Sequence, residues 1–190
     1  MGPENKLDRK ILDIGCGTRK KPNSIGMDIN PRSAADVIHN LNAFPYPFSD
    51  SSFDEIHADN VLEHLASVIR TMEEIHRIGR NGAAVIIAVP YFRSKWAYAD
   101  PTHKTFFTAE SLAYFINGTP QHDIYKYSTA EFTLEALRFN EGIDTKGLMG
   151  LIQAPAKTIA NRWPLRYENY LSQFIPLDQL TFYLRVVKPS

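Results

Sequence analysis

The stretch "ILDIGCGTRKKPNSIGMDINP", residues 11–31, decides the fold class. Its first apolar run ends at Gly15 and predicts a buried strand, while "SIGMDI" predicts a second short strand that ends on Asp28. Further strands are expected in "ADVIHNL", in residues 53–58 and in "AAVIIAVP". The last of these is continuously apolar, which is typical of a strand covered on both faces of a parallel sheet.

The rest of the chain alternates with these strands. Helical spacing of apolar residues predicts a helix from Val61 to about Gly79, and a second helix is expected from Ala109 to Asn117. "EFTLEALRFN" and "LTFYLRVVK" predict a terminal antiparallel strand pair. The pattern therefore predicts an α/β fold with a Rossmann-like doubly wound, mostly parallel sheet.

Length and composition limit the number of domains and the kinds of partner that we expect. The chain has 190 residues, zero formal net charge and one cysteine, Cys16. We expect a single domain over residues 1–190, with 91–107 and 144–176 as loop and cover segments on the substrate side. Neutral charge argues against nucleic acid as a partner, and we expect no membrane insertion. Absence of a disulfide framework suits the cytoplasm, and the oligomeric state stays unknown.

The glycine loop differs from a dinucleotide-binding loop. Its sixth position is Lys20 instead of glycine, and only residues 18–24 separate Gly17 from the next strand. A regular helix does not fit there, so the usual seat for a pyrophosphate at a helix N-terminus is weakened. This disfavours a nucleotide-dependent oxidoreductase. The basic run of residues 19–21 either covers the ligand or is solvated, and the second interpretation is favoured.

The remaining features predict an adenosine pocket at the carboxyl ends of the strands. Gly15 and Gly17 let the backbone approach a ligand closely, and Asp28 is placed to accept hydrogen bonds from a ribose diol. Ile29 and Leu41 are candidates to sandwich an adenine ring, and Asn42 to meet its polar edge. An adenosine ligand without a pyrophosphate points to S-adenosyl-L-methionine.

The same residues carry a family resemblance. "ILDIGCGT", "GMDINP", "FPYPFSDSSFDEIHADNVLEHL" and "MEEIHRIGRNGAAVIIAVP" resemble the class I S-adenosylmethionine-dependent methyltransferases in content and order. "DPTHKTFFT" and a Tyr-Glu pair near the end resemble a small bacterial or archaeal group of unassigned substrate with a shortened segment after the glycine loop. The resemblance implies the class I methyltransferase fold and a product, S-adenosyl-L-homocysteine. It implies that the methionine part of the cofactor is lined by Asp13, Gly15, Cys16, Gly17 and Asn60.

Two histidines are candidates for catalysis. His103 lies in the loop after the fifth strand and is the candidate base that removes a proton from the methyl acceptor, with Asp100 to orient it. A structural turn over residues 100–103 is the competing interpretation. His64 either faces the cofactor pocket or packs structurally. Cys16 is interpreted as a small residue in a tight turn, and the scattered histidines predict no metal site.

The sequence thus predicts methyl transfer from S-adenosylmethionine to oxygen or nitrogen of a small-molecule or glycan-like acceptor. No "NPPY"-like tetrapeptide follows the fourth strand, which argues against methylation of nucleic-acid bases. The alternative is a non-catalytic S-adenosylmethionine-binding or scaffold protein that retains the fold.

Overall fold

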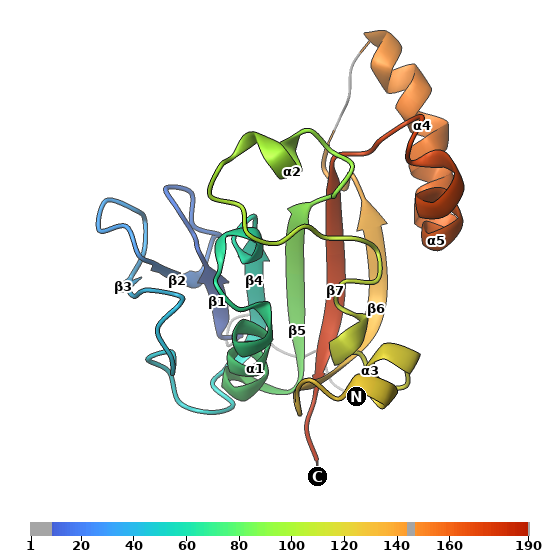
Figure 1. Cartoon of the computed structure of the whole chain (residues 1–190). Coiled ribbons are helices and arrows are strands. Elements are labelled where there is room, and N and C mark those ends of the chain that lie inside the picture. Colours follow the sequence, from blue (N-terminus) through green and yellow to red (C-terminus); the bar gives the residue numbers. More distant parts are fainter. Residues whose placement is uncertain (1–8, 144–146, 190) are drawn as a thin grey trace, which may run out of the picture.

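A seven-stranded sheet forms the centre of the computed structural model, which describes residues 9–143 and 147–189 (Figure 1). The strand order is β3-β2-β1-β4-β5-β7-β6, with β1 to β5 parallel and β7 antiparallel to both of its neighbours. The strands are β1 Ile11–Ile14, β2 Ser24–Asp28, β3 Val37–Ile38, β4 Phe53–Asp59, β5 Gly79–Pro90, β6 Glu131–Phe139 and β7 Gln179–Val187. The mostly parallel sheet with a terminal antiparallel pair is confirmed, although the third strand has only two residues.

The helices are shorter than the sequence predicted. They are the 3₁₀ turns η1 Leu62–His64 and η2 Ala113–Phe115, the α-helices α1 Val68–Ile78, α2 Trp96–Ala99, α3 Pro120–Tyr125, α4 Gly147–Arg162 and α5 Pro164–Arg166, and the π-helical turn η3 Tyr167–Leu171. None of the described helices is long and apolar enough to span a membrane.

The expected helix from Val61 is wrong in its first turns. Leu65 has extended backbone angles and ends η1, and α1 begins only after Ser67, whose side chain accepts a hydrogen bond from the Arg70 N–H. The segment between β4 and α1 is therefore a separate turn, and it carries His64. This places His64 in η1 and not in the first turn of a long helix.

The expected helix over residues 109–117 is also wrong, since this segment holds only turns and η2. The Ser111 hydroxyl accepts a hydrogen bond from the Thr108 N–H at 2.8 Å, and the Thr108 hydroxyl accepts one from the Glu110 N–H. Side chains of serine and threonine that bond nearby backbone groups compete with helix formation in this way.

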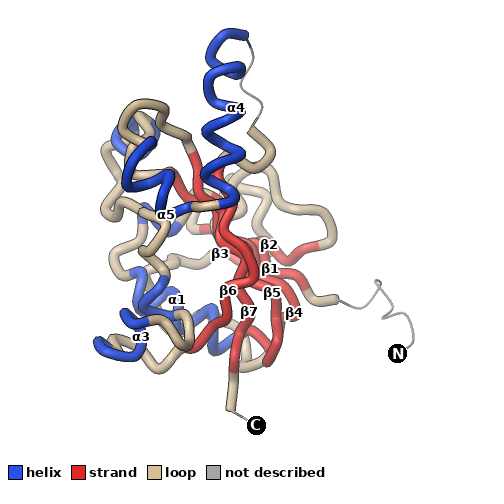
Figure 2. The backbone as a smooth tube through the Cα atoms, turned by 90° about the vertical axis from the view of Figure 1, so that its right-hand side faces the viewer, coloured by secondary structure: helices blue, strands red, loops and turns tan. Residues whose placement is uncertain are grey.

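The sheet is covered by helices on one face (Figure 2). That face is apolar, and Met72, Ile75 and Ile78 of α1 belong to its buried cluster. The opposite face presents polar side chains from neighbouring strands, among them Glu55, His57, Tyr183 and Arg185. Within the described chain no helix links β1 to β2, β2 to β3 or β3 to β4, so no helix is available for this face.

This one-sided cover corrects a detail of the prediction for β5. Ala84 and Ile86 are partly exposed on the polar face, whereas Val85 and Ile87 are buried on the helical face. The continuous apolar run was expected to be covered on both faces. The strand also begins earlier than expected, at Gly79, with a register shift against β4 between Phe53 and Glu55.

Candidate active site

The strand order places a topological switch point between β1 and β4, since the chain runs outward from β1 to β3 and then returns to the other side of β1. In open α/β sheets ligands bind at the carboxyl ends of the strands at such a point. Gly15 follows β1 directly, and Asn60 follows β4. Both lie at this edge, and Asn60 is exposed with a positive φ of 51°.

Gly15 shows why this position needs glycine. Its φ is +66°, and a Cβ atom added to it would lie 2.5 Å from Cγ2 of Val61. The glycine loop therefore packs directly on the segment that follows β4. This contact joins the predicted cofactor side of the site to the segment that carries His64.

Gly17 differs from Gly15 in its surroundings. Its φ is +53°, and no heavy atom lies within 4 Å of where a Cβ would stand. Its N–H donates to the Asp28 carboxylate at 2.9 Å, and the Asn30 N–H donates to the other oxygen at 2.8 Å. The carboxylate is thus fixed beside an open space, and each of its oxygens keeps a lone pair for a further donor.

Two of the three residues in the basic run after Gly17 form ion pairs, whereas Arg19 is exposed. Lys20 pairs with Asp36 at 2.6 Å, and Lys21 pairs with Asp59 at 2.7 Å. The Lys21 N–H also donates to the Asp13 carboxylate at 2.8 Å. Burial raises the pKa of Asp13, against which this hydrogen bond acts. The structure therefore gives Lys20, Lys21 and Asp13 a place in holding the shortened loop.

The other predicted cofactor residues lie in different surroundings. Leu41 is buried in the core, whereas 60 % of the Ile29 side chain is exposed. The Asn42 side-chain oxygen accepts a hydrogen bond from the Ala66 N–H at 2.7 Å, which ties the segment after β3 to the segment after η1. Cys16 is buried, and burial raises the pKa of its thiol, so the structure gives no support for a nucleophilic cysteine.

The loop after β5 brings the two predicted catalytic histidines together. The Lys104 N–H donates to the Glu63 carbonyl oxygen at 2.7 Å, which holds this loop against η1. The His64 and His103 rings then meet edge to face with centroids 4.6 Å apart. They line a pocket of about 600 Å³ together with Asn60, Glu63, Trp96 and four further residues.

Each imidazole is oriented through its Nδ1 atom. His103 Nδ1 lies 2.8 Å from the Ala97 carbonyl oxygen, which can only accept, so this nitrogen carries the proton. His64 Nδ1 lies 2.8 Å from the Thr102 hydroxyl, which in turn donates to Asp100. Nε2 of each neutral ring is therefore the atom with a free lone pair. The expectation that Asp100 orients His103 is wrong, because its carboxylate reaches His64 through Thr102.

Glu63 is a residue that the sequence analysis missed. Its side chain is 1 % exposed, and neither carboxylate oxygen has a hydrogen-bond partner among the described residues. Burial raises its pKa to about 7. Burial, together with the neighbouring His103, lowers the pKa of His64. The sequence signal was the Glu-His dipeptide, which lies in η1, but its partner His103 lies in a distant loop.

Comparison with known proteins decides the family. A model described as the methyltransferase domain matches residues 1–115, which include β1 to β5, the glycine loop, Asp28 and both histidines. The chain belongs to the methyltransferase domain family. With the sheet order, this match confirms the predicted family, the class I methyltransferase fold and S-adenosylmethionine as its cofactor class.

Two curated proteins are similar to this chain. An uncharacterized protein of Methanocaldococcus jannaschii is 32 % identical over 103 residues, which cover 45 % of the chain and 43 % of that protein. The chloroplastic tocopherol O-methyltransferase of Arabidopsis thaliana is 22 % identical over 221 residues, which cover 94 % of the chain and 64 % of that enzyme. The chain thus spans less than two thirds of the length of either relative.

Solved structures share the fold of this chain. An S-adenosylmethionine-dependent methyltransferase from Archaeoglobus fulgidus has a TM-score of 0.55 at 18 % identity, over 95 % of this chain and 87 % of that one. A phosphoethanolamine N-methyltransferase from Haemonchus contortus has a TM-score of 0.59 at 11 % identity, over 98 % and 51 %. The cyclase SpnF has a TM-score of 0.57 at 15 % identity, over 95 % and 75 %.

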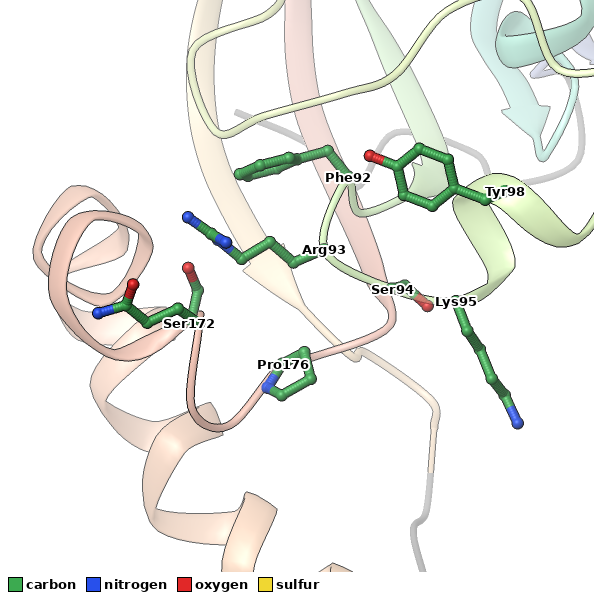
Figure 3. A pocket seen from close by; sticks show the side chains of 8 residues that line it. Phe92, Arg93, Ser94, Lys95, Tyr98, Ser172 and Pro176 are labelled. Carbon is green, nitrogen blue, oxygen red and sulfur yellow. The ribbon is translucent and has the colours of Figure 1, made fainter.

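A second pocket lies on the other side of α2. It has a volume of about 430 Å³ and is lined by residues of the 92–98 segment and by Ser172, Gln173 and Pro176 (Figure 3). Arg93 and Lys95 contribute the positive charge, and neither forms an ion pair with a described residue. The segment around α2 contributes to both pockets. Lys95 and Tyr98 line this one, and Trp96 and Ala99 line the histidine pocket.

Proposed function

We propose that this methyltransferase moves a methyl group from S-adenosyl-L-methionine to a hydroxyl or amino group of a small-molecule or glycan-like acceptor, with S-adenosyl-L-homocysteine as the product. The observation that carries the proposal is the contact between Gly15 and Val61 at the switch point. Because of this contact, the glycine loop and the histidine pocket share one edge of the sheet.

The residues at this edge fit the cofactor. Gly17 borders open space, and Asp28 is a fixed carboxylate with lone pairs left for a ribose diol. Ile29 offers exposed apolar surface beside it, and Asn60 offers an exposed polar side chain at the end of β4. When bound, S-adenosylmethionine supplies an electrophilic methyl group on a sulfonium. We assign the remaining predicted residues Asp13, Cys16, Leu41 and Asn42 to support of the loop and adenine side.

The histidines act on the acceptor in this proposal. His103 presents Nε2 to the pocket because its Nδ1–H is bound to the Ala97 carbonyl oxygen, so Nε2 can take the proton that an acceptor hydroxyl or ammonium must lose. His64, held by Thr102, lines the same pocket and is neutral at neutral pH because its pKa is lowered. We assign it to positioning of the acceptor.

Two cover segments complete the acceptor side of what we propose to be a single domain. These are residues 91–107 and 144–176. The Tyr91 ring of the first segment contacts the Tyr167 ring in the described part of the second, with centroids 6.2 Å apart. Just after the first segment, the Ala109 N–H donates to Glu168 at 2.8 Å. The described part of the second segment closes the pocket that holds Arg93. The positive charge there favours an acceptor with an anionic group close to the methylated atom.

A cytoplasmic setting is part of the proposal. Cys16, the only cysteine in the sequence, is buried and unreactive in character, which suits a reducing compartment.

Thermal stability with and without ligand tests the cofactor assignment. S-adenosylmethionine and S-adenosylhomocysteine should raise the melting temperature, and NAD should not. Asp28→Ala should abolish the shift, whereas Asp50→Ala, at an exposed position away from this edge, should retain it. No shift of the wild-type protein with either sulfur compound would overturn the proposal.

Turnover with a library of hydroxyl and amine acceptors tests the chemistry. His103→Ala should lower turnover by about 10²–10⁴-fold at unchanged cofactor affinity, as expected for loss of a general base. Cofactor binding without turnover of any acceptor would favour the non-catalytic alternative. Turnover that is unaltered in His103→Ala would exclude this residue as the base.

A further inference from the structure

Three metal-ligating side chains converge at the histidine pocket. One donor atom from each of Glu63, His64 and His103 lies within 4.8 Å of the other two, and this is the one such group of three that the described residues form. We propose that Glu63, His64 and His103 bind a divalent transition-metal cation in this pocket. The sequence predicted no metal site, because its histidines are scattered without the spacing of metal ligands.

The state of Glu63 is the first independent observation. A buried carboxylate normally has hydrogen-bond partners. The Glu63 side chain is 1 % exposed, and neither of its oxygens has a partner within the described chain. An unpaired charge in such a place is costly unless a proton or a cation neutralises it. Glu63 lines the same pocket as the two histidines, and one of its carboxylate oxygens lies within 4.8 Å of a nitrogen of each ring. A cation there would satisfy the carboxylate.

The hydrogen bonds of the two imidazoles are the second observation. Histidines that bind metals almost always donate their other ring N–H to a carbonyl, carboxylate or similar acceptor, which fixes the tautomer and the ring. His103 donates Nδ1–H to the Ala97 carbonyl oxygen, and His64 donates Nδ1–H to Thr102, which is itself bound to Asp100. Both rings are thus oriented as ligands, with Nε2 free.

The ligand set indicates the kind of cation. Two imidazoles and one carboxylate suit a first-row transition metal such as Zn²⁺, Co²⁺ or Fe²⁺, and three protein ligands leave coordination positions open. With bonds of about 2.1 Å, tetrahedral ligand atoms lie roughly 3.4 Å apart. The present separations of up to 4.8 Å require the ligand atoms to move together by up to about 1.4 Å when a cation binds.

The role of the cation, though not its binding, rests on the proposed methyl transfer. A bound cation lowers the pKa of an oxygen acid that coordinates it. The acceptor hydroxyl would then release its proton to solvent, and its oxygen would form the new bond to the methyl carbon as the carbon–sulfur bond breaks and leaves its electron pair on sulfur. With the cation bound, His103 is a ligand and the proton goes to solvent; this route is the alternative to proton transfer to His103 in the protein without the cation.

Cation binding can be measured without turnover. The chain is stripped with chelator and titrated with Co²⁺, and the visible absorbance of the bound ion is recorded, followed by displacement with Zn²⁺. We expect one Co²⁺ per chain. Glu63→Gln, which keeps the shape of the side chain, should weaken binding by about 10–100-fold or more, and Thr102→Ala should weaken it by about 10–100-fold. Thr102 is exposed, so its variant is not expected to unfold the chain.

Glu55→Gln is the matched control. Glu55 pairs with His57 at 2.6 Å on the polar face of the sheet. The substitution therefore changes a glutamate–histidine pair outside the pocket and should leave Co²⁺ binding unchanged. The proposal is overturned if wild-type protein binds no Co²⁺ saturably, or if Glu63→Gln binds it as tightly as Glu55→Gln does. A thermal shift with S-adenosylhomocysteine in the same samples separates the two proposals, since it reports cofactor binding alone.

Discussion

Substitution of Gly15 by alanine tests the contact that joins the two sides of the site. The new Cβ would lie 2.5 Å from Cγ2 and 2.8 Å from Cβ of Val61, closer than real carbon atoms approach. Val61 is 8 % exposed and is held between the end of β4 and η1, so it has little room to move. Gly17→Ala is the matched control, because its φ is also positive but nothing lies within 4 Å of the added atom.

The two substitutions should differ by the overlap alone. A left-handed backbone costs an alanine about 1–2 kcal/mol at either position. Overpacking a buried contact adds about 1–3 kcal/mol at Gly15 only. We therefore expect Gly15→Ala to lower the free energy of unfolding by roughly 2–5 kcal/mol in total. That is a large part of the roughly 5–15 kcal/mol that stabilises a typical domain.

Urea unfolding followed by far-UV circular dichroism measures the difference, since Trp96 and Trp163 are about half exposed and are poor fluorescence probes of unfolding. With a urea slope of about 2 kcal/mol per molar, a gap of 2 kcal/mol between the variants moves the midpoint by about 1 M. In a Val61→Ala background the cost of Gly15→Ala should fall, with a coupling of about 0.5–3 kcal/mol. Equal midpoints for the two glycine variants, or zero coupling, would refute the reasoning.

Two further predictions concern parts of the fold that support the site. Burial alone would raise the pKa of Glu74, but hydrogen bonds from Arg77 and from the Tyr46 N–H outweigh it and hold this pKa below 4.5. Glu74→Gln should therefore cost about 1–3 kcal/mol of stability at pH 7. The difference in stability from wild type should shrink as the pH falls below about 4.5, because wild-type Glu74 then becomes protonated. Urea midpoints at pH 7 and pH 3.5 measure this change. A gap that is the same at both values contradicts this assignment. Tyr167→Phe should cost about 1–3 kcal/mol, because the buried Leu177 N–H donates to this hydroxyl and would lose its acceptor; a thermal midpoint equal to that of wild type would contradict it.

The mostly parallel sheet with its terminal antiparallel pair, and the edge that holds the site, could be predicted from the sequence. The signals are local: apolar runs mark the strands, and the glycines and an aspartate mark their ends. In the structure Gly15 directly follows β1, and Asp28 is the last residue of β2. Their side-by-side arrangement then follows from the general behaviour of parallel sheets. The roles of the individual cofactor residues stay predictions.

The start of α1 and the pairing around Glu63 could not be predicted, because both depend on distant contacts. Apolar spacing continues smoothly from Val61, yet this residue is packed against Gly15 and the Glu63 carbonyl oxygen binds the Lys104 N–H. These contacts hold residues 61–67 out of the helix. The same hydrogen bond brings His103 to His64, so the error in the helix and the missed ligand group have one cause.

The shortened glycine loop and the bare polar face also have a common origin. A helix after β1 would cover that face and would present its N-terminus to a phosphate. Here Lys21 donates its N–H to Asp13 and pairs with Asp59, so side chains of the polar face hold the loop where a helix would have held it. Asp13 alternates with the core residues Leu12 and Ile14 along β1, which directs its carboxylate to this face. A loop held in this way keeps Gly15 against Val61 and Gly17 beside open space, which is what the site at the switch point requires.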